Sequence, residues 1–171
     1  IGTLPLVWMS LMDYQKERIY TFISPEGDAL GSGWNIAQSK IAIGSGQFFG
    51  KGYMEGSQSQ LDFIPESHTD FIFAVIVEEF GFLGALGLFL LYAFLIHRLL
   101  YVAKSSNSKF AKLVSATLSI ILAAYITLNI SMVVGIFPVV GMPLPFISQG
   151  GTALVVNMIT IGIILSLRRT T

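Results

Sequence analysis

Pro65-Glu66-Ser67-His68-Thr69-Asp70, followed directly by Phe71-Ile72-Phe73-Ala74-Val75-Ile76-Val77, divides this sequence into two unlike parts. Before it lies a long polar segment rich in glycine, and after it come apolar runs long enough to cross a membrane. The stretch therefore marks the passage from water into lipid. Ser67 with Asp70 three residues later matches a capping box, so one interpretation of Asp70 is a helix-start carboxylate. The other is a site of polar chemistry on a lipid-borne substrate, because carboxylates at a membrane are costly and mark functional sites.

The composition indicates an integral membrane protein. Of the 171 residues, 53% are hydrophobic and 12% are charged, whereas soluble domains are roughly a quarter charged. The formal net charge of zero argues against nucleic acid as a partner, because phosphate binding needs a basic excess. The chain has no cysteine, which excludes disulfide and thiolate chemistry within it.

The apolar runs predict an all-α, polytopic transmembrane fold. We expect residues 1–12 to be the end of a transmembrane helix, residues 13–70 to form a large extracytoplasmic loop with short helices, and residues 71–171 to hold three transmembrane helices. These spans are expected near residues 77–100, 113–134 and 151–168. Because the chain begins inside an apolar run, we expect it to be the C-terminal part of a longer protein.

Two glycine-rich segments and one glycine series interrupt the regular pattern. Residues 44–52 are predicted to be a loop, and Gly52 stands where a P-loop needs a serine or threonine. Residues 135–151 contain several prolines but few polar side chains, which predicts a re-entrant or cavity-lining turn on the same outer face as residues 13–70. Gly81, Gly84 and Gly87 allow either close helix packing or a kink.

The distribution of positive charge orients the chain. Residues 98–112 carry four Lys or Arg and no acid, and the C-terminus carries Arg168 and Arg169. Short basic connections stay in the cytoplasm. We therefore expect Lys109 and the C-terminus in the cytoplasm, and residues 13–70 with the proline-containing turn outside.

Several carboxylates need an explanation in this setting. Glu66, His68 and Asp70 alternate, and residues two apart point in different directions on a helix, so a dedicated structural metal site is not predicted. Glu78 and Glu79 lie inside an apolar run, where unpaired carboxylates are costly. The expected partner of these two is a basic residue of the protein outside this chain.

A series of motifs in this chain resembles the C-terminal half of the SEDS family. The matching segments are residues 38–46, 50–52, 63–75, 78–79 and 143–151. The first two are more similar to the elongation branch of that family than to its division or sporulation branches. The resemblance implies a fold of about ten membrane helices in the bacterial inner (plasma) membrane. It also implies polymerisation of lipid II into peptidoglycan glycan strands during cell elongation and shape maintenance, with a class B penicillin-binding protein as partner.

The resemblance identifies Asp70 with the essential aspartate of the family, and we predict that it is catalytic, as a general base on the acceptor sugar hydroxyl. Lys40 and Lys51, or a divalent cation such as Mg²⁺ or Mn²⁺, would neutralise the departing pyrophosphate. The predicted substrate-binding residues are Lys40, Lys51, Glu66, His68 and Ser148. The family's remaining helices would hold much of the lipid groove, so the chain alone is expected to be inactive.

Two other functions remain open at this stage. Proline-broken helices and intramembrane carboxylates also occur in transporters, which makes a lipid II flippase the main alternative. A flippase needs polar groups along the membrane midplane, whereas this chain concentrates them at one face. The third possibility is a structural scaffold for a cell-wall partner.

Overall fold

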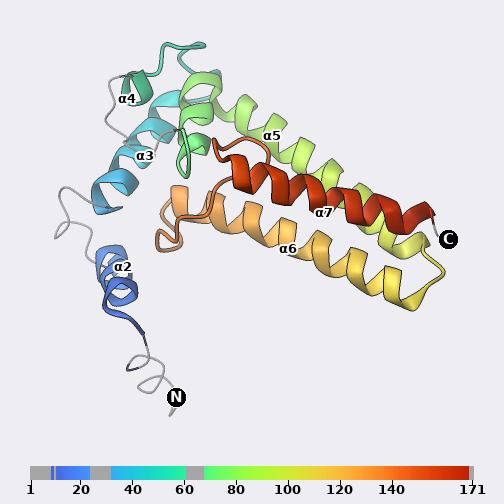
Figure 1. The fold of residues 1–171 in the computed structure, drawn as a ribbon. Helices are drawn as coiled ribbons and strands as arrows, with labels where there is room; N and C mark the ends of the chain where they lie inside the picture. Colours follow the sequence, from blue (N-terminus) through green and yellow to red (C-terminus); the bar gives the residue numbers. More distant parts are fainter. Residues whose placement is uncertain (1–8, 10, 24–31, 61–67, 170–171) are drawn as a thin grey trace.

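The computed structural model describes residues 9, 11–23, 32–60 and 68–169, and no β-strand occurs in these ranges. The helices are α2 (Asp13–Ile23), α3 (Ser32–Gly46), α4 (Ser57–Gln60), α5 (Ile72–Ser105), α6 (Lys109–Val133) and α7 (Gly151–Arg169) (Figure 1). The predicted all-α class is confirmed. The described part of residues 13–70 contains short helices, as expected.

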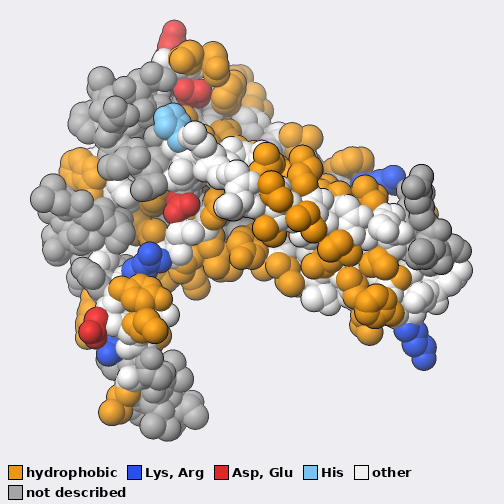
Figure 2. Space-filling view, viewed as in Figure 1, with side chains coloured by type: hydrophobic (Ala, Val, Ile, Leu, Met, Phe, Trp, Pro, Cys, Tyr) orange, Lys and Arg blue, Asp and Glu red, His pale blue; other side chains and the backbone are white. Residues whose placement is uncertain are grey.

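Helices α5, α6 and α7 lie side by side in an elongated bundle (Figure 1). By length and composition, α5 with 34 residues and α6 with 25 residues are able to span a membrane, and Gly151–Leu167 of α7 is a shorter apolar helix. Large apolar side chains remain exposed on all three, including Leu90 at 62% and Leu113 at 68%. Orange side chains accordingly cover much of the bundle in Figure 2. Such helices are typical of lipid-facing segments.

Helix α3 lies across one end of the bundle, against the first part of α5 and the last turn of α6 (Figure 1). Ser39 is fully buried in this contact, and its Oγ lies 2.8 Å from the carbonyl oxygen of Val133. The loop predicted for residues 44–52 begins later than expected, because α3 continues to Gly46. Gly46 packs directly on the backbone of Val77, where any side chain would collide.

Helix α5 is broken at Gly81, whose φ of +65° is incompatible with an α-helix. A helix pairs each carbonyl with the amide four residues later. The break therefore separates the carbonyls of Glu78 and Glu79 from the amides of Phe82 and Leu83. A kink, one of the two roles open to the glycine series, is therefore observed at Gly81.

Residues 47–52 supply the partners that the break removes. The amides of Lys51 and Gly52 donate to the Glu78 and Glu79 carbonyls, each at 3.0 Å. In return, the carbonyls of residues 47 and 48 accept from the amides of residues 82 and 83 at 2.9 and 3.2 Å. Four hydrogen bonds to the loop thus replace two helical ones, and the 47–52 loop and α5 form one structural unit.

Glu78 is paired within this chain, which corrects the expectation of a partner outside it. Its Oε1 accepts hydrogen bonds from Lys51 Nζ at 2.7 Å, from the Gln58 amide at 3.0 Å and from the Ser57 hydroxyl at 3.3 Å. The Glu78 side chain is fully buried, while that of Lys51 is 28% exposed. The pair was missed because its members are 27 residues apart in sequence and meet only where the loop enters the helix break.

The two ends of the bundle differ in structure and in charge. Helices α3 and α4 and the α6–α7 turn occupy one end, and the α5–α6 connection occupies the other (Figure 1). Residues 13–70 and the proline-containing turn therefore share one end over the described residues, as predicted. On the face shown in Figure 2, acidic side chains occur only at this end, and Lys or Arg alone mark the opposite end.

Candidate functional site

Asp70 lies half-buried at the end of the turn that leads into α5. The N-cap of α5 is Phe71 and the helix begins at Ile72, so Asp70 stands one position before the cap. The predicted capping box placed Asp70 inside the first turn of the helix and is wrong on this point. Ser67, its other member, lies outside the described residues. Asp70 still lies beside the N-terminus of α5, so its interpretation as a helix-start carboxylate stabilised by the helix dipole stays open.

Three consecutive hydrogen bonds fix the backbone that carries Asp70. The carbonyls of residues 68, 69 and 70 accept, in that order, from the Gln149 amide at 2.9 Å, the Ser148 hydroxyl at 2.6 Å and the Asn129 side-chain amide at 2.8 Å. Two of the donors belong to the α6–α7 turn and one to α6. Residues 148 and 149 of the proline-containing turn therefore contact the segment that carries Asp70.

The α6–α7 turn is itself anchored to both neighbouring helices. The Tyr92 hydroxyl on α5 donates to the Pro145 carbonyl at 2.7 Å, and Asn129 on α6 donates to the Met142 carbonyl at 2.6 Å. Within the turn, the Ser148 hydroxyl accepts from the Leu144 amide at 2.6 Å. Ser148 therefore holds two backbone segments together, and its predicted contact with substrate stays a prediction.

Gly141 of the same turn faces the carboxylate. Its φ of +72° is in the left-handed region that favours glycine, and a Cβ at this position would lie 3.5 Å from Asp70 Oδ2. The Asp70 carboxylate therefore lies next to the backbone of Gly141, which has no side chain to cover it, at the end of the bundle. A carboxylate held in this way is able to take a proton from a hydroxyl group placed beside it.

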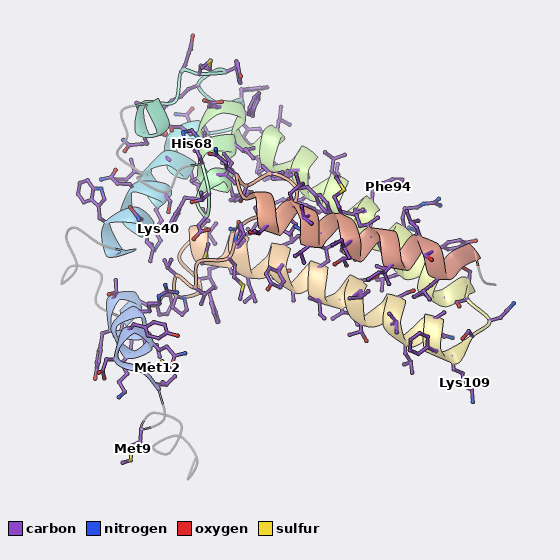
Figure 3. All side chains as sticks on the ribbon, in the orientation of Figure 1. Met9, Met12, Lys40, His68, Phe94 and Lys109 are labelled. Atoms are coloured by element: carbon purple, nitrogen blue, oxygen red, sulfur yellow. The ribbon has the colours of Figure 1, made fainter. Side chains whose placement is uncertain are left out.

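The other predicted site residues have different surroundings. Lys40, on α3, is exposed and lies over Gly135, where an added Cβ would meet its Nζ at 2.6 Å. His68 is also exposed, at the end of the bundle that carries α3 (Figure 3). Lys51 is engaged by Glu78 rather than open to a ligand. Glu66 lies outside the described residues.

The sequence also predicted a divalent cation near the pyrophosphate as an alternative to the two lysines. Within the ranges that the structure describes, no three His, Cys, Asp or Glu side chains come close enough to hold a metal ion. Mg²⁺ often binds through only one or two carboxylates together with substrate phosphates, so a divalent cation at this end of the bundle stays a prediction.

Asn129 is a site residue that sequence reasoning did not single out. It is fully buried and lies in α6, a span whose central part carries no charge. The sequence does show that Asn129 is a polar residue in an otherwise apolar membrane helix. Burying such a group in lipid costs free energy, and polar residues at these positions are often functional. Its two partners were not predictable, since both are backbone carbonyls of irregular segments.

Residues 1–171, the whole chain, match the family described as "Cell cycle protein" that comprises FtsW, RodA and SpoVE. The chain belongs to the FtsW/RodA/SpoVE family. An FtsW/RodA/SpoVE relative from Escherichia coli K12, the peptidoglycan glycosyltransferase MrdB, is 51% identical over 165 residues. That alignment covers 96% of this chain and 45% of the relative, so the chain spans about half the length of the protein it matches.

Two solved structures support the FtsW/RodA/SpoVE fold. One comes from work on the coordination of polymerisation and crosslinking by a peptidoglycan synthase complex. It matches with a TM-score of 0.74 and 29% identity, covering 95% of this chain and 44% of the other. The second is an aspartate-to-alanine mutant of the Thermus thermophilus Rod shape determining protein RodA. Its TM-score is 0.58 at 33% identity, over 61% of this chain and 35% of that protein.

Proposed function

We propose that the full-length protein containing this chain is a peptidoglycan glycosyltransferase that polymerises lipid II into glycan strands during cell elongation and shape maintenance. The Escherichia coli relative carries the name of this activity at 51% identity. The elongation role rests on the similarity of residues 38–46 and 50–52 to that branch of the family and on the Rod-shape name of the Thermus thermophilus relative. The proposed catalytic mechanism rests on one observation, the fixed position of Asp70 at one end of the bundle.

In the proposed reaction, Asp70 is the general base. A sugar hydroxyl of the acceptor attacks the anomeric carbon of the donor while Asp70 takes the hydroxyl proton. The bond from the anomeric carbon to the lipid pyrophosphate breaks, and the pyrophosphate leaves with the electron pair. General-base catalysis contributes typically 10²–10⁴-fold to such a step. The three hydrogen bonds to residues 68–70 support this role because a base must be held at a fixed distance from its proton.

Neutralisation of the leaving pyrophosphate is assigned to Lys40. Its side chain is exposed and lies over Gly135 at the α6–α7 turn, the segment that also contacts Asp70. Lys51 is the weaker candidate, because its ammonium group lies 2.7 Å from Glu78 Oε1. His68 and Glu66 remain proposed substrate contacts. A divalent cation enters the proposal only as a counter-ion that comes with the pyrophosphate.

The proposed setting is the bacterial inner membrane, with residues 13–70 and the α6–α7 turn outside the cytoplasm. The proposed partner is a class B penicillin-binding protein, which would crosslink the strands. The support is the structural match to work on a complex that couples polymerisation with crosslinking.

Replacement of Asp70 by asparagine in the full-length protein tests the proposal. Purified protein with its partner is supplied with labelled lipid II, and glycan strands are measured. We expect the Asp70→Asn rate to fall on the order of 10²–10⁴-fold, with expression and partner binding unchanged. Asp13→Asn, which removes an exposed carboxylate on α2, is the matched control and should keep the parental rate.

Two results would redirect the assignment. Strand synthesis by Asp70→Asn within a few-fold of the parent contradicts a general base at this position. Transfer of lipid II across vesicles without any strand synthesis by the parent protein would favour the flippase instead, because a flippase forms no glycosidic bond.

A further inference from the structure

We propose that Asn129 is a positioning residue for the reaction, acting through Asp70 and not on the substrate. The inference rests on the proposed function, because it concerns how the catalytic carboxylate is held. Asn129 is the one of the three donors to residues 68–70 that lies within a regular helix, α6. A helix is a more rigid support than the turn that supplies the other two.

The orientation of the Asn129 amide follows from its partners. Nδ2 lies 2.8 Å from the Asp70 carbonyl oxygen and 2.6 Å from the Met142 carbonyl oxygen. Both neighbours are acceptors, so the donating end of the amide must face them. A flipped amide would place its oxygen against two carbonyl oxygens. Each N–H bond of the side chain is therefore assigned to one of the two segments that form the site.

The other end of the amide shows that stability alone does not explain the residue. Asn129 Oδ1 is buried and has no hydrogen-bond partner among the described residues. A buried, unpaired acceptor costs about 1–3 kcal/mol. The side chain thus carries a penalty in order to tie the peptide of Asp70 to the turn at Met142. That turn also contains Gly141, which faces the Asp70 carboxylate.

Loss of the amide would loosen both segments at once. The Asp70 carbonyl would lose the hydrogen bond from Asn129 Nδ2, and the Met142 carbonyl in the turn beside the carboxylate would lose its hydrogen bond to α6. Displacement of a catalytic group by about 1 Å can cost on the order of 10²-fold in rate. Binding of lipid II depends on other contacts and should change little. The signature of a positioning residue is therefore a reduced kcat with a nearly constant KM.

The test uses Asn129→Ala in the full-length protein, with kcat and KM for lipid II polymerisation measured on protein that elutes as a single folded species. We expect kcat to fall about 10–100-fold and KM to stay within about threefold. Asn129→Ser, which keeps one hydroxyl donor in a smaller side chain, provides a second variant if the alanine variant does not fold. It should lose less than Asn129→Ala but show the same separation of kcat from KM.

Asn157→Ala is the matched control. Asn157 lies on α7 and lines a groove of about 480 Å³ between α6 and α7, and it makes none of the three hydrogen bonds that hold residues 68–70. Asn157 is partly buried, whereas Asn129 is fully buried, and the same substitution at Asn157 should leave kcat within about threefold of the parent. A fall as large as that of Asn129→Ala would show that any lost amide in this bundle impairs the enzyme, and would overturn the inference.

A double-mutant cycle with Asp70→Asn separates positioning from a general structural effect. If Asn129 acts through Asp70, Asn129→Ala should reduce the residual rate of Asp70→Asn by less than about threefold. An equal loss in both backgrounds, or a folded Asn129→Ala protein with parental kcat, overturns the inference. A parental rate in Asp70→Asn alone instead overturns the proposed function, so the two failures are distinguishable.

Discussion

Glu78 is a buried carboxylate whose hydrogen-bond partners lie 20 to 27 residues before it in the sequence. Its side chain is fully buried, and the ammonium group of Lys51 at 2.7 Å balances its charge. The Gln58 amide and the Ser57 hydroxyl complete its surroundings. Removal of one member of such a pair leaves an uncompensated charge in a low-dielectric site.

Lys51→Met should therefore destabilise the protein. We expect a loss of about 1–3 kcal/mol in the free energy of unfolding, below the 3–5 kcal/mol of a wholly buried pair because Lys51 is partly exposed. Thermal unfolding in detergent measures the effect. Lys51→Met combined with Glu78→Gln should recover most of the loss, and an unchanged transition in the single variant would contradict the structural role of the pair.

The same double variant separates folding from substrate binding. If Lys51 only pairs with Glu78, the double variant should polymerise lipid II at close to the parental rate. A folded but inactive double variant would restore Lys51 to the substrate-binding set predicted from sequence.

At this scale the sequence could indicate a candidate residue but not its contacts. Asp70 was singled out by its place between a polar segment and an apolar run, and its predicted catalytic role came from the resemblance to the SEDS family. The Lys51–Glu78 pair and the bonds of Asn129 depend on tertiary contacts between segments 27 and 59 residues apart. No periodicity or local motif encodes such distances.

At the scale of elements, the break in α5 is the main departure from a simple span. Gly81 combines a φ of +65° with the backbone of Gly50 packed against it. The carbonyl carbon of Phe48 would lie 2.7 Å from an added Cβ. Glycine is thus required here both for its backbone conformation and for the close approach of the 47–52 loop.

Gly81→Ala should displace the loop and destabilise the fold. Gly81 has φ +65° and ψ −159°, a backbone region that is essentially restricted to glycine and costs other residues roughly 1–3 kcal/mol, and the collision with the loop adds to that. Limited proteolysis of residues 47–56 and thermal unfolding in detergent are the measurements. Gly87→Ala is the matched control, because a Cβ there meets no atom within 4 Å and alanine favours a helix.

Equal protease resistance in the two variants would contradict this account of Gly81. The sequence had indicated that the glycine series permits a kink or close packing, and the structure shows both at Gly81 and open space at Gly87. Sequence spacing alone treats the three glycines alike. The difference arises from which of them meets the loop.

At the scale of the whole molecule, the charge distribution predicts the orientation in the membrane. The end that carries α3 and α4 is expected on the extracytoplasmic side of the membrane, and the α5–α6 connection is expected in the cytoplasm. The order of the spans and the all-α class could be predicted because an apolar run of membrane length can cross a bilayer in few structures other than a helix. The arrangement of α3 across the bundle end could not, since it depends on buried contacts such as Ser39 with Val133.

Single cysteines test this orientation. Lys40 and Lys109 are both exposed, and the chain contains no cysteine of its own. In spheroplasts, a membrane-impermeant thiol reagent should modify Lys40→Cys and leave Lys109→Cys unmodified until the membrane is permeabilised. The reverse pattern would place the Asp70 site in the cytoplasm and remove the proposed reaction from the outer face.

The repaired break in α5 also has a consequence for biogenesis. Residues 82–105 extend about 36 Å as a helix, enough to cross the roughly 30 Å hydrocarbon core without the preceding turns. Without the 47–52 loop, the peptide groups on either side of Gly81 would be unpaired and could not enter that core, because each would cost several kcal/mol there. The 47–52 loop is synthesised about 30 residues before them and is already present when they leave the ribosome. Because the docked loop pairs these groups, we expect its binding to keep the stretch around Gly81, and with it Asp70, at the edge of the bilayer.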